Sequence, residues 1–252
     1  MRVILDQETF GANAARLQPL ADRVASEVDN LIPGSLGEYP ENGIICFEPE
    51  SSWSSDPSHP APITLIGPKV GGEPAATSGN TIRIALYGVK PDYEGRLIYQ
   101  LSHELAHVKM GVHASNYLVE TFAVAVSYEV LRRMGADGYA QLAMGLDMGK
   151  LPEQVQAQLK ARDWPALEAY WQSQIASQAG KMNDRPFQTL GYLLLARSGE
   201  PNWSLLLGIA NFHDHCEIVN SDLHFPVCAP DLARMAKLGL NLIPLGYIAA
   251  NN

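Results

Sequence analysis

The chain is poor in cysteine and in long apolar stretches, and each shortage excludes a class of protein. Its 252 residues include only three cysteines, Cys46, Cys216 and Cys228, and no pair has Cys-x-x-Cys spacing. Such a sparse, odd set predicts no disulfide framework and fits a reducing compartment. No apolar run reaches the roughly 20 residues of a membrane-spanning helix. The apolar stretch at the amino end is too short for a signal peptide, so we expect a soluble, cytoplasmic protein.

Positive charge is also scarce. The chain has 18 Lys and Arg residues against 27 Asp and Glu residues, which gives a formal net charge of −9 at pH 7. No run of basic residues stands out, so nucleic acid and anionic membranes are not expected partners. The hydrophobic content of 46% and the charged content of 18% are those of a globular protein with a sizeable core.

One short motif carries the clearest chemical signal. Residues 100–108 read Gln-Leu-Ser-His-Glu-Leu-Ala-His-Val and contain His-Glu-x-x-His. On a helix, residues four apart share a face, so His103 and His107 can offer both imidazoles to one metal ion. Glu104 can place its carboxylate beside a water molecule at that metal. These are the groups that a zinc hydrolase needs.

A helical pair of histidines can also be a surface accident. The residues around the motif argue against this, because they give the helix a broad apolar face: Leu97, Ile98, Leu101, Leu105 and Val108. The helix is therefore predicted to lie in the core. Burying two histidines and a glutamate without partners is costly, and a metal ion would satisfy all three side chains.

A zinc site needs a third protein ligand, and two residues follow the motif closely. Glu120 comes after twelve intervening residues, in the first turn of a helix expected over 117–134. Gly111 is predicted to end the preceding helix as a left-handed cap. A short connection of this kind would return Glu120 toward the histidine pair. His113, after five intervening residues, is the alternative ligand, and the motif context favours Glu120.

The pattern resembles that of the gluzincin-type zinc metallopeptidases, in which His-Glu-x-x-His is followed by a distant Glu. The resemblance covers residues 95–134 closely and extends to small bacterial proteins that carry this motif. It implies that His103, His107 and Glu120 are the ligands of Zn²⁺. It also implies that Glu104 is the general base and that the substrate is a peptide or a protein.

The chain departs from that family in its supporting residues. The segment between His107 and Glu120 is shorter than in thermolysin. The position four residues after Glu120, where an Asp often supports a zinc-bound histidine, is Val124. The partner that orients the ligands is therefore not identified. The residue that stabilises the oxyanion also stays open among four candidates: Tyr192, His213, His215 and His224.

Apolar periodicity along the chain predicts an α+β fold. A helical region over 7–31, with a break or kink expected near Gln18 because of Pro19, precedes three short strands at 44–47, 63–66 and 81–86. Helices over 91–110 and 117–134 carry the motif. The remaining predicted helices are a pair within 151–180 and single helices at 187–196, 203–212 and 232–238.

The predicted order of elements agrees with the family resemblance. Zinc peptidases of that class place a small sheet before the active-site helix. We therefore expect one zincin-like metallopeptidase domain over 1–252, with a mainly α-helical C-terminal half. Its parts are an N-terminal helix and small sheet (1–90), a zinc-binding helix pair (91–134) and a helical part (135–252).

Two other classes of function fit the same residues. The chain could be a zinc-stabilised peptide-binding or regulatory module that uses an exposed sheet edge and cleaves nothing. It could also hydrolyse an amide that is not a peptide. Substrate, cleavage mode and oligomeric state cannot be deduced from the sequence.

Overall fold

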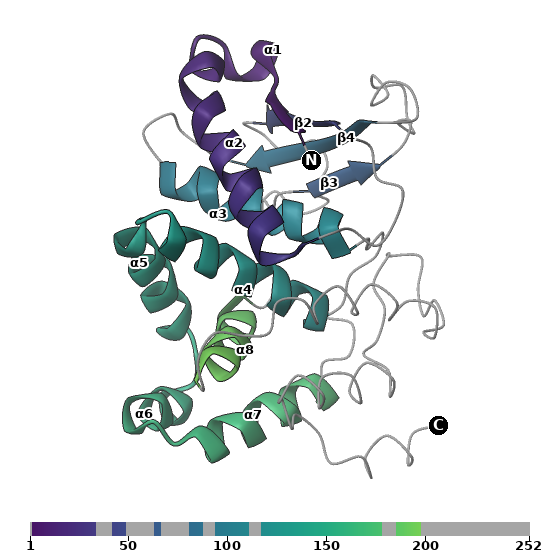
Figure 1. Cartoon of the computed structure of the whole chain (residues 1–252). Coiled ribbons are helices and arrows are strands. Elements are labelled where there is room, and N and C mark those ends of the chain that lie inside the picture. The colour runs from purple at the N-terminus through teal and green to yellow at the C-terminus, as the bar shows by residue number, and fades with distance from the viewer. Residues whose placement is uncertain are drawn as a thin grey trace, which may run out of the picture. The chain divides into compact units, whose positions relative to one another are not determined.

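The structure is a computed structural model of the chain, shown in Figure 1. It describes residues 2–33, 42–48, 63–66, 81–87, 94–110, 117–177 and 185–197. This part of the chain is mostly helical, with a sheet near its N-terminus. The chain divides into two compact units. The first comprises residues 1–111 and 126–140, and the second comprises residues 112–125 and 141–252.

The first unit contains a four-stranded sheet. Its strands are β1 (Arg2–Leu5), β2 (Asn42–Glu48), β3 (Ile63–Ile66) and β4 (Thr81–Tyr87), in the order β1-β2-β4-β3. β2 pairs in parallel with both β1 and β4, whereas β3 pairs antiparallel with β4. The three predicted strands are present. β1 was not predicted, because only four residues alternate there, with Val3 and Leu5 buried.

Two helices follow β1, namely α1 (Gln7–Phe10) and α2 (Asn13–Leu31). A break or kink was predicted near Gln18, and the helix does not break there. The break lies at Gly11, whose φ of 54° suits glycine, and α2 continues through Pro19. Proline removes one helical hydrogen bond, but packing compensates, because the apolar face of α2 is buried along its whole length.

Gln18 also ties α2 to the sheet. Its Oε1 accepts a hydrogen bond of 2.9 Å from the Leu5 N–H, and its Nε2 donates one of 2.9 Å to the Val3 carbonyl. α2 packs against both β1 and α3 (Glu94–Met110), as Figure 1 shows. The sheet and these two helices therefore form the core of the first unit.

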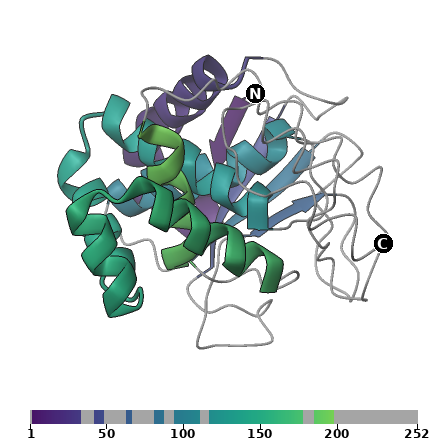
Figure 2. The same ribbon diagram turned by 90° about the horizontal axis from the view of Figure 1, so that it is seen from below.

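The C-terminal part of the described chain is helical, as predicted. Its helices are α4 (Tyr117–Arg133), α5 (Asp137–Met148), α6 (Glu153–Ala161), α7 (Trp164–Ser177) and α8 (Arg185–Ala196). α7 packs against α6 and α8, which can be followed in Figure 2. Trp171 of α7 stacks on Phe187 of α8, with ring centroids 5.0 Å apart, and donates a hydrogen bond to its carbonyl oxygen.

One described helix was not predicted, and two predicted helices cannot be compared with the structure. α5 was not predicted, because its glycines and its exposed Leu142 and Leu146 obscure a helical pattern. The helices expected over 203–212 and 232–238 lie outside the described residues. Within the described ranges, no helix is long and apolar enough to cross a membrane.

Candidate metal centre

The motif lies on α3, which is buried on nearly all sides. Every residue from 97 to 108 is buried except His103, which is half-buried. The hydroxyl of Ser102, inside this stretch, donates a hydrogen bond of 2.6 Å to the Ile98 carbonyl, so it does not require an outside partner. The prediction of a core helix is confirmed. The two histidines are therefore in surroundings where a polar group needs a compensating interaction.

Ion pairs connect both ends of α3 to α2 within the first unit. At the start of α3, Arg16 Nη1 lies 3.4 Å from Glu94 Oε1. Near its end, the Lys109 ammonium pairs with the Asp29 carboxylate, and the Lys109 side chain is mostly buried. An exposed pair such as Arg16–Glu94 contributes little stability by itself, and the Lys109–Asp29 pair is less exposed. Together with the apolar packing, however, they fix the helix that carries both histidines at two points.

α4 begins at Tyr117, as predicted, and its residues 121–131 are all buried. Glu129 is the one carboxylate in that buried run, and it accepts hydrogen bonds from Arg132 and Arg133. Burial raises the pKa of Glu129, but the hydrogen bonds and charges of the two arginines outweigh this and hold it below its ordinary value. The Glu129 carboxylate is therefore paired with the two arginines. Glu120 is the other carboxylate of α4 and the candidate metal ligand on this helix.

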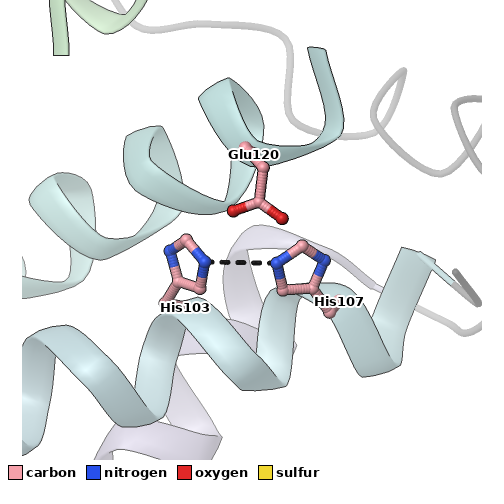
Figure 3. Close-up of side chains that lie close together, drawn as sticks. All are labelled: His103, His107 and Glu120. Atoms are coloured by element: carbon pink, nitrogen blue, oxygen red, sulfur yellow. Dashed lines mark hydrogen bonds between the residues drawn. The ribbon is translucent and has the colours of Figure 1, made fainter. Parts of the chain in front are cut away.

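The two histidines and Glu120 come together in the structure. The Nε2 atoms of His103 and His107 lie 3.2 Å apart, with the rings edge-on at a centroid distance of 4.9 Å. One ligand atom from each of His103, His107 and Glu120 lies within 4.8 Å of the other two. Figure 3 shows the Glu120 carboxylate facing the space between the two imidazoles. The three predicted ligands thus converge on one point.

The separation of the nitrogens fits a shared metal ion. Two nitrogens bound to one zinc ion at about 2.0–2.1 Å, in tetrahedral geometry, are about 3.3 Å apart. The observed 3.2 Å agrees with this value. The donor set of two imidazoles and one carboxylate is also that of catalytic zinc sites, in which a fourth position stays open. A hydrogen bond between the two rings would instead require one Nε2 to carry a proton and the other to accept it.

Glu104 lies directly after His103 on α3, and only 3% of its surface is exposed. A carboxylate is rarely buried to this extent unless it has a specific role or partner. Of the four oxyanion candidates, Tyr192 lies on α8 and is half-buried. The other three, His213, His215 and His224, lie outside the described residues, as does the alternative ligand His113.

The aromatic residues beside the histidines were not predicted from the sequence. The Tyr99 ring lies nearly parallel to that of His103, with centroids 6.4 Å apart and an interplanar angle of 22°. Tyr128 of α4 meets Tyr99 edge-on at 5.5 Å. The four-residue spacing of Tyr99 and His103 was available in the sequence. The approach of Tyr128 was not, because it depends on how α4 packs.

Comparisons with family models, with curated proteins and with solved structures found no match to this chain. The function must therefore be inferred from the residues of the site and from their geometry.

Proposed function

We propose that the chain is a zinc-dependent metallopeptidase with a zincin-like fold. In this proposal His103, His107 and Glu120 hold Zn²⁺, and Glu104 is the general base. The observation that carries the proposal is the convergence of these three residues, each of which places one ligand atom within 4.8 Å of those of the other two. The neighbouring Glu104 supplies the one further group that metal-assisted hydrolysis requires.

When bound, zinc would polarise the scissile carbonyl and lower the pKa of a water molecule. Proton transfer would then be carried out by the protein's own residues. Glu104 takes a proton from the attacking water molecule while the oxygen of that water bonds to the carbonyl carbon. It returns that proton to the amide nitrogen as the carbon–nitrogen bond breaks, so that an acid and an amine leave. The burial of Glu104 keeps its carboxylate away from bulk water during both transfers.

The sheet supports a peptide as the substrate in preference to a small amide. β3 stands at one end of the described strand order, with β4 on one side only, and α3 packs against both strands. An extended peptide could add to such an edge through main-chain hydrogen bonds. The helix that carries His103 and His107 would then lie beside the bound peptide. A small amide would make no use of this edge.

The test is hydrolysis by a Glu104→Gln variant of a peptide found by substrate profiling. Glutamine keeps the size of the side chain but cannot accept the proton, so the rate should fall roughly a hundredfold or more. Metal content and thermal stability should stay at the level of the unsubstituted protein. The matched control is Glu153→Gln, an exposed glutamate in the first turn of α6, where no change is expected.

Three outcomes would contradict the proposal. If Glu104→Gln hydrolyses the peptide at the original rate, Glu104 is not the base. If the unsubstituted protein binds zinc and peptides but cleaves none of a diverse set, it is a binding module. Cleavage of small amides alone would instead point to a non-peptide hydrolase.

A further inference from the structure

Four aromatic rings form a row inside the first unit, and two of them are the histidines of the metal centre. Along α3, Tyr99, His103 and His107 follow one another at intervals of four residues and so share one face of the helix. Tyr128 of α4 closes the row at its far end. Tyr99 and Tyr128 are 5% and 1% exposed, so neither ring can move freely into solvent.

The contacts along the row are specific in geometry. Tyr128 meets Tyr99 edge-on at 5.5 Å with an angle of 73°, and Tyr99 lies nearly parallel to His103 at 6.4 Å. His103 meets His107 edge-on at 4.9 Å with an angle of 65°. All three distances fall in the range in which aromatic rings attract one another, and these orientations are the favoured ones. The row is therefore a packed structure rather than a chance alignment.

A histidine ligand needs such support, because its ring direction is poorly fixed by its own torsions. The torsion between Cβ and the ring has broad, roughly two-fold preferences, so an unsupported imidazole sweeps its Nε2 through a wide arc. Groups that orient a metal-binding histidine, most often hydrogen-bond partners of its other ring nitrogen, are known to control metal affinity. At His103, the tyrosine ring occupies one side and the His107 ring the other.

We propose that Tyr99 is a positioning residue for the metal centre: its ring, held by Tyr128, aims His103 Nε2 at the ion. This inference rests on the metal site proposed above and adds a role that the sequence motif does not contain. Tyr99 acts through the face of its ring, and its hydroxyl is not required. The two functions of the residue, filling the core and aiming His103, can therefore be separated by substitution.

The experiment measures zinc affinity, by competition with a chromophoric chelator, in the full-length chain and three variants. Tyr99→Phe keeps the ring and should bind zinc within about twofold of the unsubstituted protein. Tyr99→Leu removes the ring, and Tyr99→Met does so with a flexible side chain that refills the space. Both should bind zinc at least about tenfold more weakly, in line with the loss of other groups that orient a ligand.

A spectroscopic readout separates positioning from general loosening of the fold. With Co²⁺ in place of zinc, the visible absorption bands report coordination geometry. They should change in Tyr99→Leu and Tyr99→Met and stay unchanged in Tyr99→Phe. Phe10→Leu, another buried aromatic substitution in the first unit, is the control and should lose stability without changing the cobalt spectrum or the zinc affinity.

Several other results would contradict the proposed role of the Tyr99 ring. If the leucine and methionine variants bind zinc within twofold of the unsubstituted protein, the ring does not position His103. If Tyr99→Phe weakens binding as much as Tyr99→Leu, the hydroxyl and not the ring is responsible. Should the leucine variant fail to fold, the methionine variant gives the same comparison. If the unsubstituted protein binds no zinc, the metal site itself is refuted, and this inference with it.

Discussion

Gly191 in α8 lies directly against Thr121 in α4, the residue next to Glu120. A side-chain carbon at position 191 would lie 2.5 Å from Thr121 Cγ2 and 2.9 Å from Trp171 Cζ2. Both distances are too short for real contacts, so α8 can take this place only because position 191 has no side chain. The glycine therefore fixes the packing beside the first turn of α4, which contains Glu120.

Gly191→Ala should lower the free energy of unfolding by about 1–3 kcal/mol, since the added methyl group overpacks a close contact. Urea denaturation would measure this loss. The matched control is Gly145→Ala in α5, where an added carbon meets nothing within 4 Å. That variant should be neutral or stabilised by up to about 1 kcal/mol, because alanine is the better helix former. Equal effects at the two positions would show that position 191 is not closely packed.

Glu129 should make the stability of the protein depend on acid pH. Its folded-state pKa lies below the ordinary value of 4.5, so the unfolded chain binds the proton first as the pH falls. The stabilisation from Glu129 is therefore fully present above about pH 4.5 and is lost as the pH falls through the folded-state pKa. Glu129→Gln should cost about 1.5–3 kcal/mol at pH 7, the usual range for hydrogen bonds to charged groups.

The cost of Glu129→Gln should shrink as the pH falls from 4.5 through the folded-state pKa, because Glu129 is then protonated first in the unfolded chain and finally in the folded protein. Urea unfolding at pH 7, 5, 4 and 3 measures the difference between the two proteins. Glu153→Gln, at an exposed position in α6, provides the baseline. A cost that stays constant over this pH range would mean that the arginine contacts of Glu129 do not stabilise the fold.

Gln18 should matter for the attachment of β1. Gln18→Met keeps the length of the side chain but removes its hydrogen bonds with the Leu5 N–H and the Val3 carbonyl. The free energy of unfolding should fall by about 1–2 kcal/mol. Hydrogen exchange at the Leu5 amide should accelerate as well. Gln7→Met, at an exposed position in α1, should change neither quantity, and an unchanged Leu5 exchange rate in Gln18→Met would refute the role.

The helices around the site could be predicted from the sequence because their local signals agree. In α3 the apolar spacing marks one continuous helix, and the four-residue interval of His103 and His107 then fixes their common face. Glu120 could be placed in the first turn of α4 because the apolar run after it is long and unbroken. Both statements need only helix geometry, which the sequence expresses directly.

The missed features all depend on contacts between distant segments. β1 has only four residues, and its strand state comes from pairing with β2, about forty positions away. α2 continues past Pro19 because packing outweighs the missing hydrogen bond. The contact of Tyr128 with Tyr99 and that of Gly191 with Thr121 likewise follow from helix packing. Such contacts have no signature in a local pattern.

The metal content of the purified protein tests the central claim most directly. Protein prepared without added zinc should carry about one zinc ion per chain by elemental analysis. Glu120→Ala should weaken zinc binding by orders of magnitude in chelator competition, because one of three protein ligands is lost. Glu153→Ala, an exposed glutamate in the first turn of α6, is the matched control and should bind as the unsubstituted protein does.

His113→Ala, measured in the same competition, separates Glu120 from the alternative ligand. Zinc binding that is weakened in Glu120→Ala and unchanged in His113→Ala is the result expected here. Zinc binding that is lost in His113→Ala and retained in Glu120→Ala would contradict it. A preparation that contains no zinc and takes up none at neutral pH would overturn the metal centre altogether.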